Sequence, residues 1–282
     1  MVNRKLIYDV GLHKGEDTSF YLKKGFKVVA FEANPDLADF CRNRFEQHVS
    51  SGQLTIVEGA ILENSNQTKR KVKFYKNDEK SVWGTVVEDW AERNSGLGKS
   101  SQVIEVDAID FSVCLEKYGI PYYMKIDIEG MDLVCLRALK EFDMRPSYIS
   151  IESEKVDFDA LKQELNLLEE LGYSDFKAVN QSKVPAQKEP QNTLEGELVN
   201  HKFKIGSSGL FGLDLEGAWA GKEEVLKQYE SIFRAYRLFG DQSVFSKTKI
   251  GQKFTDAMNR LLGIPGWYDT HARHENEKTN YD

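Results

Sequence analysis

Several features that would place a protein in a specialised class are missing from this sequence. No apolar run approaches the ~18 residues of a membrane-spanning helix, so we expect no membrane partner. Cysteine is scarce: Cys41, Cys114 and Cys135 are an odd number and lack the close spacing of a metal site, so we expect reduced, buried thiols. Basic residues are not in excess either. The net charge of −7 disfavours nonspecific phosphate binding, and we expect no nucleic-acid partner.

The composition is that of an ordinary soluble globular protein, with 40% hydrophobic and 29% charged residues. At 282 residues the chain is long enough for one large α/β domain, or for one domain with additions. It passes from Arg4 and Lys5 directly into an apolar run. We therefore expect no signal peptide and a cytoplasmic location.

The first part of the chain predicts one βαβ unit with a carboxylate at the end of each strand. Two apolar runs, residues 6–8 and 28–31, are typical of buried parallel strands. Asp9 follows the first run and Glu32 follows the second. Between them, residues 16–24 predict a helix, and a glycine follows where a left-handed C-cap is favourable.

The loop between the first strand and this helix indicates the class of ligand. Ligands of open parallel sheets bind beyond the carboxyl ends of the strands. Gly11 and Gly15 allow the backbone to approach such a ligand closely, and Glu32 suits the hydroxyls of a ribose. The third glycine of a dinucleotide fingerprint is missing, and Asp9 would repel a diphosphate but suit an ammonium and a sulfonium group. These features favour S-adenosylmethionine over the alternative of an NAD-dependent oxidoreductase.

The alternation of strands and helices breaks after a third predicted strand that ends near Gly59. The small residue Ala60 is expected beside the adenine ring, although Gly59 is equally well explained as a turn glycine. Residues 68–110 predict a β-rich insert, because residues 71–75 and 102–106 alternate polar and apolar side chains.

The remaining elements are expected to complete one sheet and to add helices. One predicted strand ends at Asp127 and another ends at Glu152. Residues 182–200 are rich in proline, glutamine and charge, and predict an exposed loop. The charged tail from Glu275 is expected to be disordered. Strands are expected at residues 122–126, 147–151, 176–179 and 203–205, and helices at 161–171 and 222–236.

With these motifs placed, the sequence resembles the FkbM family of S-adenosylmethionine-dependent methyltransferases over residues 6–179. Residues 124–132, MKIDIEGMD, are similar to the family's K-x-D-x-E-G signature at the fourth strand. The D-V-G of residues 9–11 and the F-E-A-N-P of residues 31–35 match as well. Residues 12–14, Leu-His-Lys, depart from the D-V-G-A-N-x-G loop that is common in the family.

The resemblance implies an α/β fold of the class I methyltransferase type, with a Rossmann-like sheet of about seven mostly parallel strands and helices on both faces. The predicted methyltransferase domain covers residues 1–212, with the insert at 68–110, and a helical C-terminal extension and tail cover residues 213–282. The family also implies methyl transfer to a hydroxyl of a small metabolite or sugar. Such a reaction requires alignment of the acceptor and removal of its proton.

The candidate site residues follow from these placements. Asp127 ends the fourth strand beside the methyl group and is a catalytic candidate, unless it caps the next helix. Glu129 is a candidate base or a helix cap, and His271 is a candidate base, a metal ligand or part of a solvated tail. Glu152 is a candidate to join Asp127 on a divalent metal, although no metal site is predicted. The predicted cofactor-binding residues are Asp9, Gly11, His13, Gly15, Thr18, Glu32, Ala33, Ala60 and Asp127.

We therefore predict an O-methyltransferase that uses S-adenosylmethionine and acts on a small hydroxylated acceptor. His13 is either a base or a donor within the loop. A noncatalytic nucleotide-binding module of the same fold is the alternative from another class, and a homodimer is left open.

Overall fold

The computed structural model describes residues 1–63, 71–77, 101–128, 130–153, 157–239 and 267–280. The chain divides into two compact units. The first consists of Met1–Ile149 with Glu195–Val199, and the second of Ser150–Leu194 with Asn200–Asp282.

Seven strands form one sheet in the order β3-β2-β1-β7-β8-β10-β9. β1 pairs in parallel with β2 and β7, β2 pairs in parallel with β3, and β10 runs antiparallel to β9. This arrangement confirms the predicted α/β sheet of about seven mostly parallel strands. The strands are β1 (Asn3–Val10), β2 (Lys27–Glu32), β3 (Leu54–Glu58), β7 (Pro121–Ile126), β8 (Tyr148–Glu152), β9 (Tyr173–Asn180) and β10 (Tyr268–His274).

Helices fall between most of these strands along the chain, and the helices predicted at residues 16–24, 161–171 and 222–236 are among them. In the first unit they are α1 (Glu16–Lys23), α2 (Pro35–Arg44), α3 (Glu46–Ser50), α5 (Phe111–Tyr118) and α6 (Asp132–Ala138), followed by the short 3-10 helix η2 (Leu139–Glu141). In the second unit they are α7 (Phe158–Glu170) and α8 (Lys222–Phe239), with the 3-10 helices η3 (Gln181–Ala186), η4 (Gly212–Asp214) and η6 (Glu275–Asn280).

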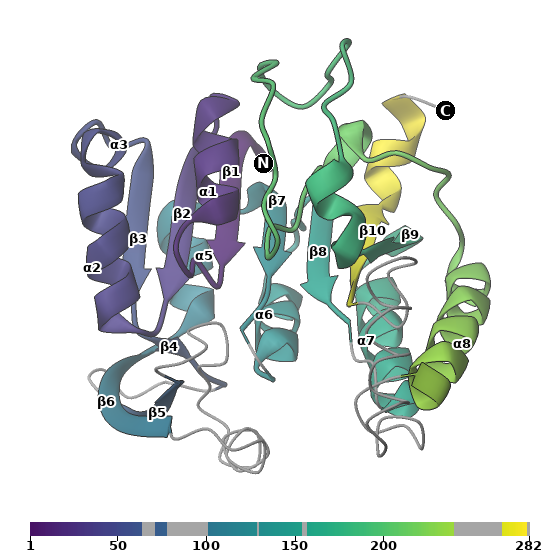
Figure 1. Cartoon of the computed structure of the whole chain (residues 1–282), viewed down its shortest axis with the longest axis horizontal. Helices are drawn as coiled ribbons and strands as arrows, with labels where there is room; N and C mark the ends of the chain where they lie inside the picture. Colours follow the sequence, from purple (N-terminus) through teal and green to yellow (C-terminus); the bar gives the residue numbers. More distant parts are fainter. Residues whose placement is uncertain (64–70, 78–100, 129, 154–156, 240–266, 281–282) are drawn as a thin grey trace. The chain divides into compact units, whose positions relative to one another are not determined.

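The central strand β1 shows why helices cover both faces of the sheet in the first unit. Successive residues of a strand point to opposite faces. The ring of Tyr8 packs against Phe111 of α5, with centroids 6.1 Å apart, whereas the neighbouring Asp9 accepts a hydrogen bond from Thr18 of α1. α1 and α5 therefore lie on opposite faces; α1 is in front of β1 and β2 in Figure 1, and α5 is behind them.

Side-chain caps set the starts of several helices. Asn34, Asp110 and Asp157 precede α2, α5 and α7 in extended backbone, and each accepts a hydrogen bond from an N–H group of the first turn. The start of α1 is different, because Gly15 precedes it with a φ of 75°. The left-handed conformation of this glycine turns the chain from the loop after β1 into the helix.

The predicted β-rich insert is confirmed where the structure describes it. β4 (Ala60–Ile61), β5 (Lys71–Asn77) and β6 (Ser101–Ile109) form a second sheet in the order β4-β6-β5, and β5 is antiparallel to β6. Gly59 precedes β4 with a φ of 138°, and a Cβ atom there would lie 2.5 Å from the carbonyl oxygen of Asp107 in β6. Close packing against β6 therefore requires a glycine at this position.

The C-terminal predictions are partly wrong. Residues 203–205 form no strand in the described part of the chain, and the last strand is β10, at residues 268–274. This segment is not a solvated tail, since His271 is 1% exposed. Likewise, residues Glu275–Asn280 form η6 instead of a disordered tail.

Pairing with β9 explains how so polar a segment is buried. His271 lies opposite Lys177, and Arg273 lies opposite Asp175. Arg273 Nε is 3.3 Å from Asp175 Oδ2, and both side chains are largely buried. The ion pair and the backbone pairing with β9 thus offset part of the cost of burying this polar segment.

The predicted exposed loop at residues 182–200 is also only partly correct. Val184 in η3 is fully buried. Glu195 is 1% exposed, and its carboxylate accepts a hydrogen bond of 2.9 Å from Tyr122 of β7. Residues 195–199 accordingly belong to the first unit, although their neighbours in the chain belong to the second.

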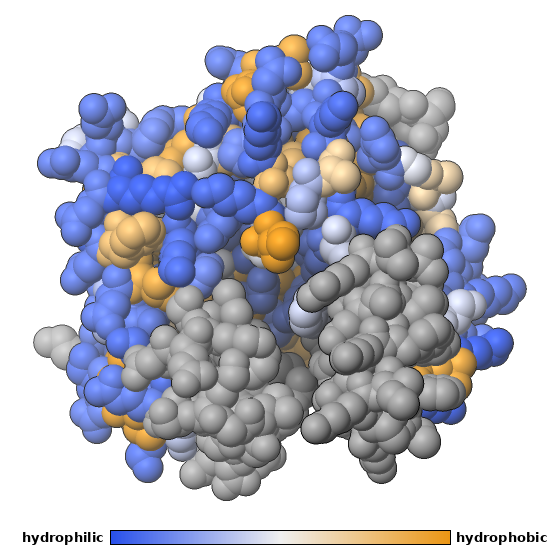
Figure 2. All heavy atoms as spheres, viewed as in Figure 1, coloured by the Kyte–Doolittle hydropathy of each residue, from blue (hydrophilic) through white to orange (hydrophobic). Residues whose placement is uncertain are grey.

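The visible face of the molecule is mostly hydrophilic where its residues are described (Figure 2). On the face shown in Figure 2, hydrophobic residues form only small, separate groups among hydrophilic ones. Among the described helices, none combines the length and the apolar character that crossing a membrane requires.

Candidate functional site

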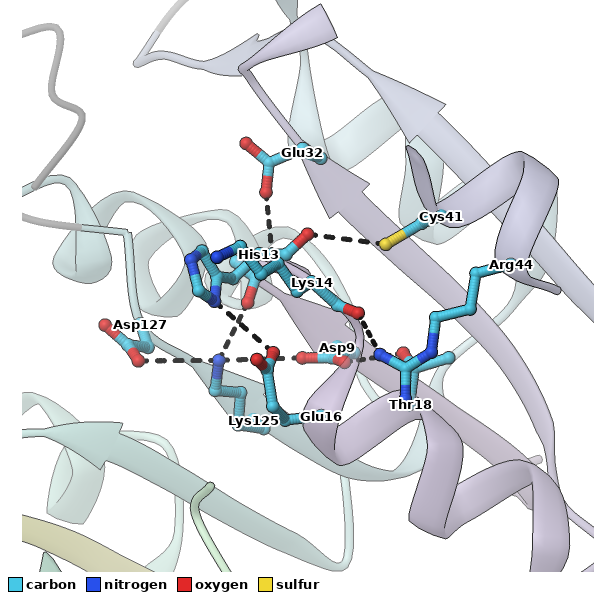
Figure 3. A network of polar contacts seen from close by, with 11 residues as sticks. Asp9, His13, Lys14, Glu16, Thr18, Glu32, Cys41, Arg44, Lys125 and Asp127 are labelled. Atoms are coloured by element: carbon cyan, nitrogen blue, oxygen red, sulfur yellow. Dashed lines mark hydrogen bonds and ion pairs between the residues drawn. The ribbon is translucent and has the colours of Figure 1, made fainter. Parts of the chain in front are cut away.

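The register of the central strands brings three loops together at one edge of the sheet. Asp9 of β1 lies beside Ala30 of β2 on one side and Lys125 of β7 on the other. Because these strands are parallel, the loops after β1, β2 and β7 all leave from the same edge. Figure 3 shows side chains from the three strands converging there. This is the edge at which open parallel sheets bind their ligands.

The glycine loop, residues 11–15, passes close to the end of β7. Gly11 has a φ of 95°, and a Cβ atom on it would overlap the carbonyl oxygen of Asp127. The N–H groups of Gly11 and Leu12 both donate to the carbonyl of Phe31, over 3.1 and 2.9 Å, which joins the loop to β2. A Cβ atom on Gly15 would overlap the ring of Phe45. Both glycines of the predicted motif are therefore required by close contacts on either side of the loop.

Glu32 is oriented toward the glycine loop. Oε2 accepts a hydrogen bond of 2.8 Å from the backbone N–H of His13, and Oε1 accepts one of 2.8 Å from that of Asn34. The side chain is 8% exposed, and burial raises its pKa to about 7. Each carboxylate oxygen has a second lone pair, so the pair of hydroxyls of a ribose could bind without breaking either contact.

Asp9 is placed deeper than expected for a residue that touches a ligand. It is 1% exposed, and its Oδ2 accepts a 2.6 Å hydrogen bond from the hydroxyl of Thr18, which is itself fully buried. Oδ1 lies 3.6 Å from the ammonium nitrogen of Lys125. Burial raises the pKa of Asp9, and the ammonium group of Lys125 opposes that effect. The structure thus gives Asp9 and Thr18 partners inside the protein, beneath the loop.

Lys125 pairs with neighbouring carboxylates and faces the glycine loop. Its Nζ donates a 2.9 Å hydrogen bond to the carbonyl of Gly11 and lies 3.5 Å from Oδ2 of Asp127. Lysine at this position is 4% exposed. Side chains alternate between the two faces along β7, so Lys125 lies on the same face as Tyr123, which packs against α1. This alternation is the feature of the sequence that could have indicated the direction of the Lys125 side chain.

Asp127 is the accessible carboxylate of the group. Its side chain is 44% exposed, compared with 1% for Asp9. The alternative role as a cap of the next helix is not what the structure shows: α6 begins at Asp132, and Met131 occupies the capping position. Asp132 instead accepts hydrogen bonds from the N–H groups of Ile128 and Gly130, over 3.0 and 3.2 Å, and so shapes the loop.

His13 adopts a φ of 50°, the left-handed region in which Asn and His are enriched among non-glycine residues. Its Nδ1 is 3.3 Å from Oε2 of Glu16, and its carbonyl accepts a weak 3.4 Å hydrogen bond from Sγ of Cys41. Arg44 donates to the carbonyl of Lys14. The contact of His13 with Glu32 is made by its backbone N–H, so the role of its side chain stays a prediction. The sequence carried no signal for Glu16, Cys41 or Arg44, because each acts through one contact to the loop.

The other predicted residues have different surroundings. Ala60 is buried in a small cluster with Phe74 and Val106, and Ala33 packs against that cluster. Glu129 lies outside the described residues. His271 belongs to the second unit, where burial lowers its pKa to about 3 and so favours the neutral imidazole. Among the described residues, no group of three or more His, Cys, Asp or Glu side chains is arranged to hold a metal ion.

Comparisons with known proteins agree with this geometry. A family model described as "Methyltransferase FkbM domain" matches residues 9–174, which is more than half of the chain and contains the glycine loop, Glu32, Lys125 and Asp127. No match is found among curated proteins. The family match favours methyl transfer over the NAD-dependent alternative.

Three solved structures are similar to this chain at low identity. A SAM dependent methyltransferase from Archaeoglobus fulgidus is 14% identical, with 95% of this chain and 86% of that chain covered and a TM-score of 0.37. The Precorrin-6y C5,15-methyltransferase from Geobacter metallireducens GS-15 is 16% identical, with 71% and 77% covered and a TM-score of 0.36. Methyltransferase FkbM from Methylobacillus flagellatus KT is 17% identical, with 58% and 37% covered and a TM-score of 0.35.

Proposed function

This chain belongs to the FkbM family of S-adenosylmethionine-dependent methyltransferases, and we propose that it methylates a hydroxyl group of a small, oxygen-rich acceptor. The cofactor site proposed for this reaction is the glycine loop with Glu32 and Asp127. The acceptor is proposed to bind beside Asp127, beyond the end of β7.

The observation that carries the proposal is the position of Glu32. Its two carboxylate oxygens are fixed by the N–H groups of His13 and Asn34, each at 2.8 Å, at the carboxyl end of β2. A carboxylate held there beside a close glycine loop fits the ribose of a nucleoside cofactor. The loop fits as well, because any side chain at Gly11 would fill the space against Asp127.

The charge of the site also fits a cationic cofactor. Asp9, Glu32 and Asp127 bring three carboxylates to the three strand ends, whereas Lys125 provides one buried ammonium group. This excess of negative charge favours a ligand with an ammonium and a sulfonium group, and disfavours a diphosphate.

The residues of the chain have separable tasks in the proposed reaction. When bound, S-adenosylmethionine supplies a methyl group that its positive sulfur already activates for in-line attack. Asp127, at 44% exposure, is the carboxylate placed to orient the acceptor hydroxyl and to take its proton. The glycine loop and Glu32 hold the methyl donor in place, so that the rate increase comes mainly from aligning the donor with the acceptor hydroxyl.

The experiment has a binding part and a product part. Titration calorimetry with S-adenosylhomocysteine should show binding to the wild type and at least about tenfold weaker binding to Glu32→Ala. Glu63→Ala removes an exposed glutamate of the same unit and serves as the control, with affinity unchanged. Mass spectrometry after incubation with S-adenosylmethionine and matched alcohols and amines should find the added methyl on oxygen.

Each result has a distinct meaning. Equal affinity of the wild type and Glu32→Ala would remove Glu32 from the ribose site. Methylation of the amines alone would replace the hydroxyl acceptor with a nitrogen one. Cofactor binding without product from either set would favour the noncatalytic module of the same fold.

A further inference from the structure

We infer that Lys125 is a positioning residue of the cofactor site, which joins the carbonyl of Gly11 to the carboxylates of Asp9 and Asp127 and so fixes the glycine loop against the end of β7. The inference rests on the proposed function, since it assigns a task within the same site. No role is proposed for Lys125 in touching the cofactor or the acceptor.

The placement of Lys125 follows from the strand register. Lys125 lies opposite Asp9 in the β1–β7 pair, so their side chains leave the sheet on the same face. Nζ then reaches past the end of β1 to the carbonyl of Gly11, at 2.9 Å. One side chain thereby contacts the first residue of the loop and the strand that precedes it; Figure 3 shows Lys125 between Asp9 and Asp127.

The charges around Nζ are arranged on two sides. Oδ1 of Asp9 is 3.6 Å away and Oδ2 of Asp127 is 3.5 Å away, so the ammonium group lies nearly midway between an interior and an exposed carboxylate. Removing one partner of such a buried pair is costly, because the remaining charge is left desolvated. The ammonium group therefore favours the arrangement in which both carboxylates stay close.

Two strands that carry the ligand-binding loops are thus coupled through one side chain. If Lys125 is replaced by a neutral apolar residue, Asp9 faces no ammonium group at that distance, and Asp127 loses the contact that orients it. The Gly11 carbonyl also loses a donor. We expect the loop and the Asp127 side chain to lose their fixed positions together, which weakens cofactor binding and the orientation of the acceptor.

A double-mutant cycle on ligand affinity tests this coupling. Binding of S-adenosylhomocysteine is measured by calorimetry for the full chain as wild type, Lys125→Met, Asp127→Asn and the double variant. We expect Lys125→Met to bind at least about tenfold more weakly. We expect the double variant to bind within about threefold of Lys125→Met, because Asp127 has already lost its position. Losses that multiply would overturn the inference.

Controls separate positioning from a general loss of stability. Lys117→Met removes a fully exposed lysine of α5 and should leave the affinity unchanged. Tyr229→Phe, in the buried interior of the second unit, should lower the unfolding temperature without changing the affinity. If it weakens binding as strongly as Lys125→Met does, stability alone explains the loss and the inference is wrong.

A second variant keeps the test decisive if Lys125→Met does not fold. Lys125→Gln keeps a polar N–H donor but carries no charge, and it should fold with at least about tenfold weaker binding. Wild-type affinity in Lys125→Gln would overturn the inference. Absence of binding by the wild type would instead refute the proposed function, so the two failures are distinguishable.

Discussion

The backbone N–H of His13 donates a 2.8 Å hydrogen bond to Oε2 of Glu32, which joins the glycine loop after β1 to the carboxylate at the end of β2. The geometry of this contact depends on the left-handed conformation of His13, whose φ is 50°. Glu32, which is proposed to bind the ribose, therefore also holds the glycine loop in place. Loss of Glu32 should disturb both.

Ligand affinity should depend on pH through Glu32. Burial raises the pKa of this carboxyl to about 7, and the ionised form is the better acceptor for two hydroxyl groups. Affinity for S-adenosylhomocysteine should therefore rise as pH increases toward 7, by at most about tenfold per pH unit, and level off above it. Calorimetry at about pH 5.5, 7 and 8.5 measures this, and Glu32→Gln should remove the dependence.

The raised pKa of Glu32 also makes the free protein less stable as pH rises, whereas ligand affinity increases with pH. Stability contributed by protonated Glu32 is fully present below its ordinary pKa of 4.5 and is lost as pH rises through about 7. A pH profile of ligand affinity that is identical in wild type and Glu32→Gln would contradict the assignment of this titration to Glu32.

Replacement of Gly11 should be more damaging than its backbone angle alone explains. Gly11 and Gly52 have φ values of 95° and 74°, so alanine is strained at both positions, by about 1–2 kcal/mol. Of these two positions, only Gly11 would bring the added Cβ against another group, the carbonyl of Asp127. Gly11→Ala should therefore lower the free energy of unfolding more than Gly52→Ala does, and should weaken binding of S-adenosylhomocysteine at least about tenfold.

Urea unfolding and calorimetry on the two variants give the comparison. Because a Cβ atom added to Gly52 would have no neighbour within 4 Å, the Gly52→Ala variant measures the backbone strain alone. Equal losses of stability and unchanged ligand affinity in Gly11→Ala would show that the loop does not need the close approach.

The sequence predicted the parallel part of the fold because apolar runs and their terminal carboxylates are local patterns. Asp9 and Glu32 could be placed at strand ends in this way. The contact between Lys125 and the carbonyl of Gly11 could not, because it joins residues 114 positions apart and depends on strand register. The same reason explains why Asp9 was expected at the surface of the site, although the structure pairs it with Thr18.

The error at β10 has a different physical cause. A strand that contains Asp269, His271, Arg273 and His274 shows no apolar pattern, and so it resembled a solvated tail. One of its charged side chains, Arg273, pairs with Asp175 on β9, which lies 98 residues away in the sequence. Burial of such a polar strand cannot be predicted from its own sequence, because it depends on the partner strand.

The hydrogen bond from Thr18 to Asp9 can be tested with two variants, one that loses the hydroxyl and one that loses the methyl group. Thr18 is fully buried, and its hydroxyl donates to Oδ2 of Asp9 over 2.6 Å. Thr18→Val keeps the shape but removes the donor, and should cost about 1–3 kcal/mol of unfolding free energy. Thr18→Ser keeps the donor but loses a methyl group, at a cost of about 1 kcal/mol. A valine variant as stable as the serine variant in urea unfolding would contradict the role of this bond.

Three buried hydroxyl groups connect the elements of the second unit. Oγ of Ser153 lies 2.8 Å from the hydroxyl of Tyr229 and 2.6 Å from Oγ1 of Thr270, and these two are 2.8 Å apart. The chain after β8, helix α8 and strand β10 meet at this group. Because each hydroxyl both donates and accepts, loss of one leaves the others incompletely bonded in a buried position.

Tyr229→Phe should therefore lower the free energy of unfolding by about 1–3 kcal/mol, although the aromatic ring is retained. Tyr268→Phe is the matched control, because its hydroxyl accepts one 3.0 Å bond from Asn180 at a partly exposed position where water can replace it. The midpoint of urea unfolding should fall further for Tyr229→Phe than for Tyr268→Phe, with the same dependence on urea. If both variants lose equal stability, the cluster of three hydroxyls contributes no more than an ordinary exposed bond, and the second unit is held together by its apolar contacts.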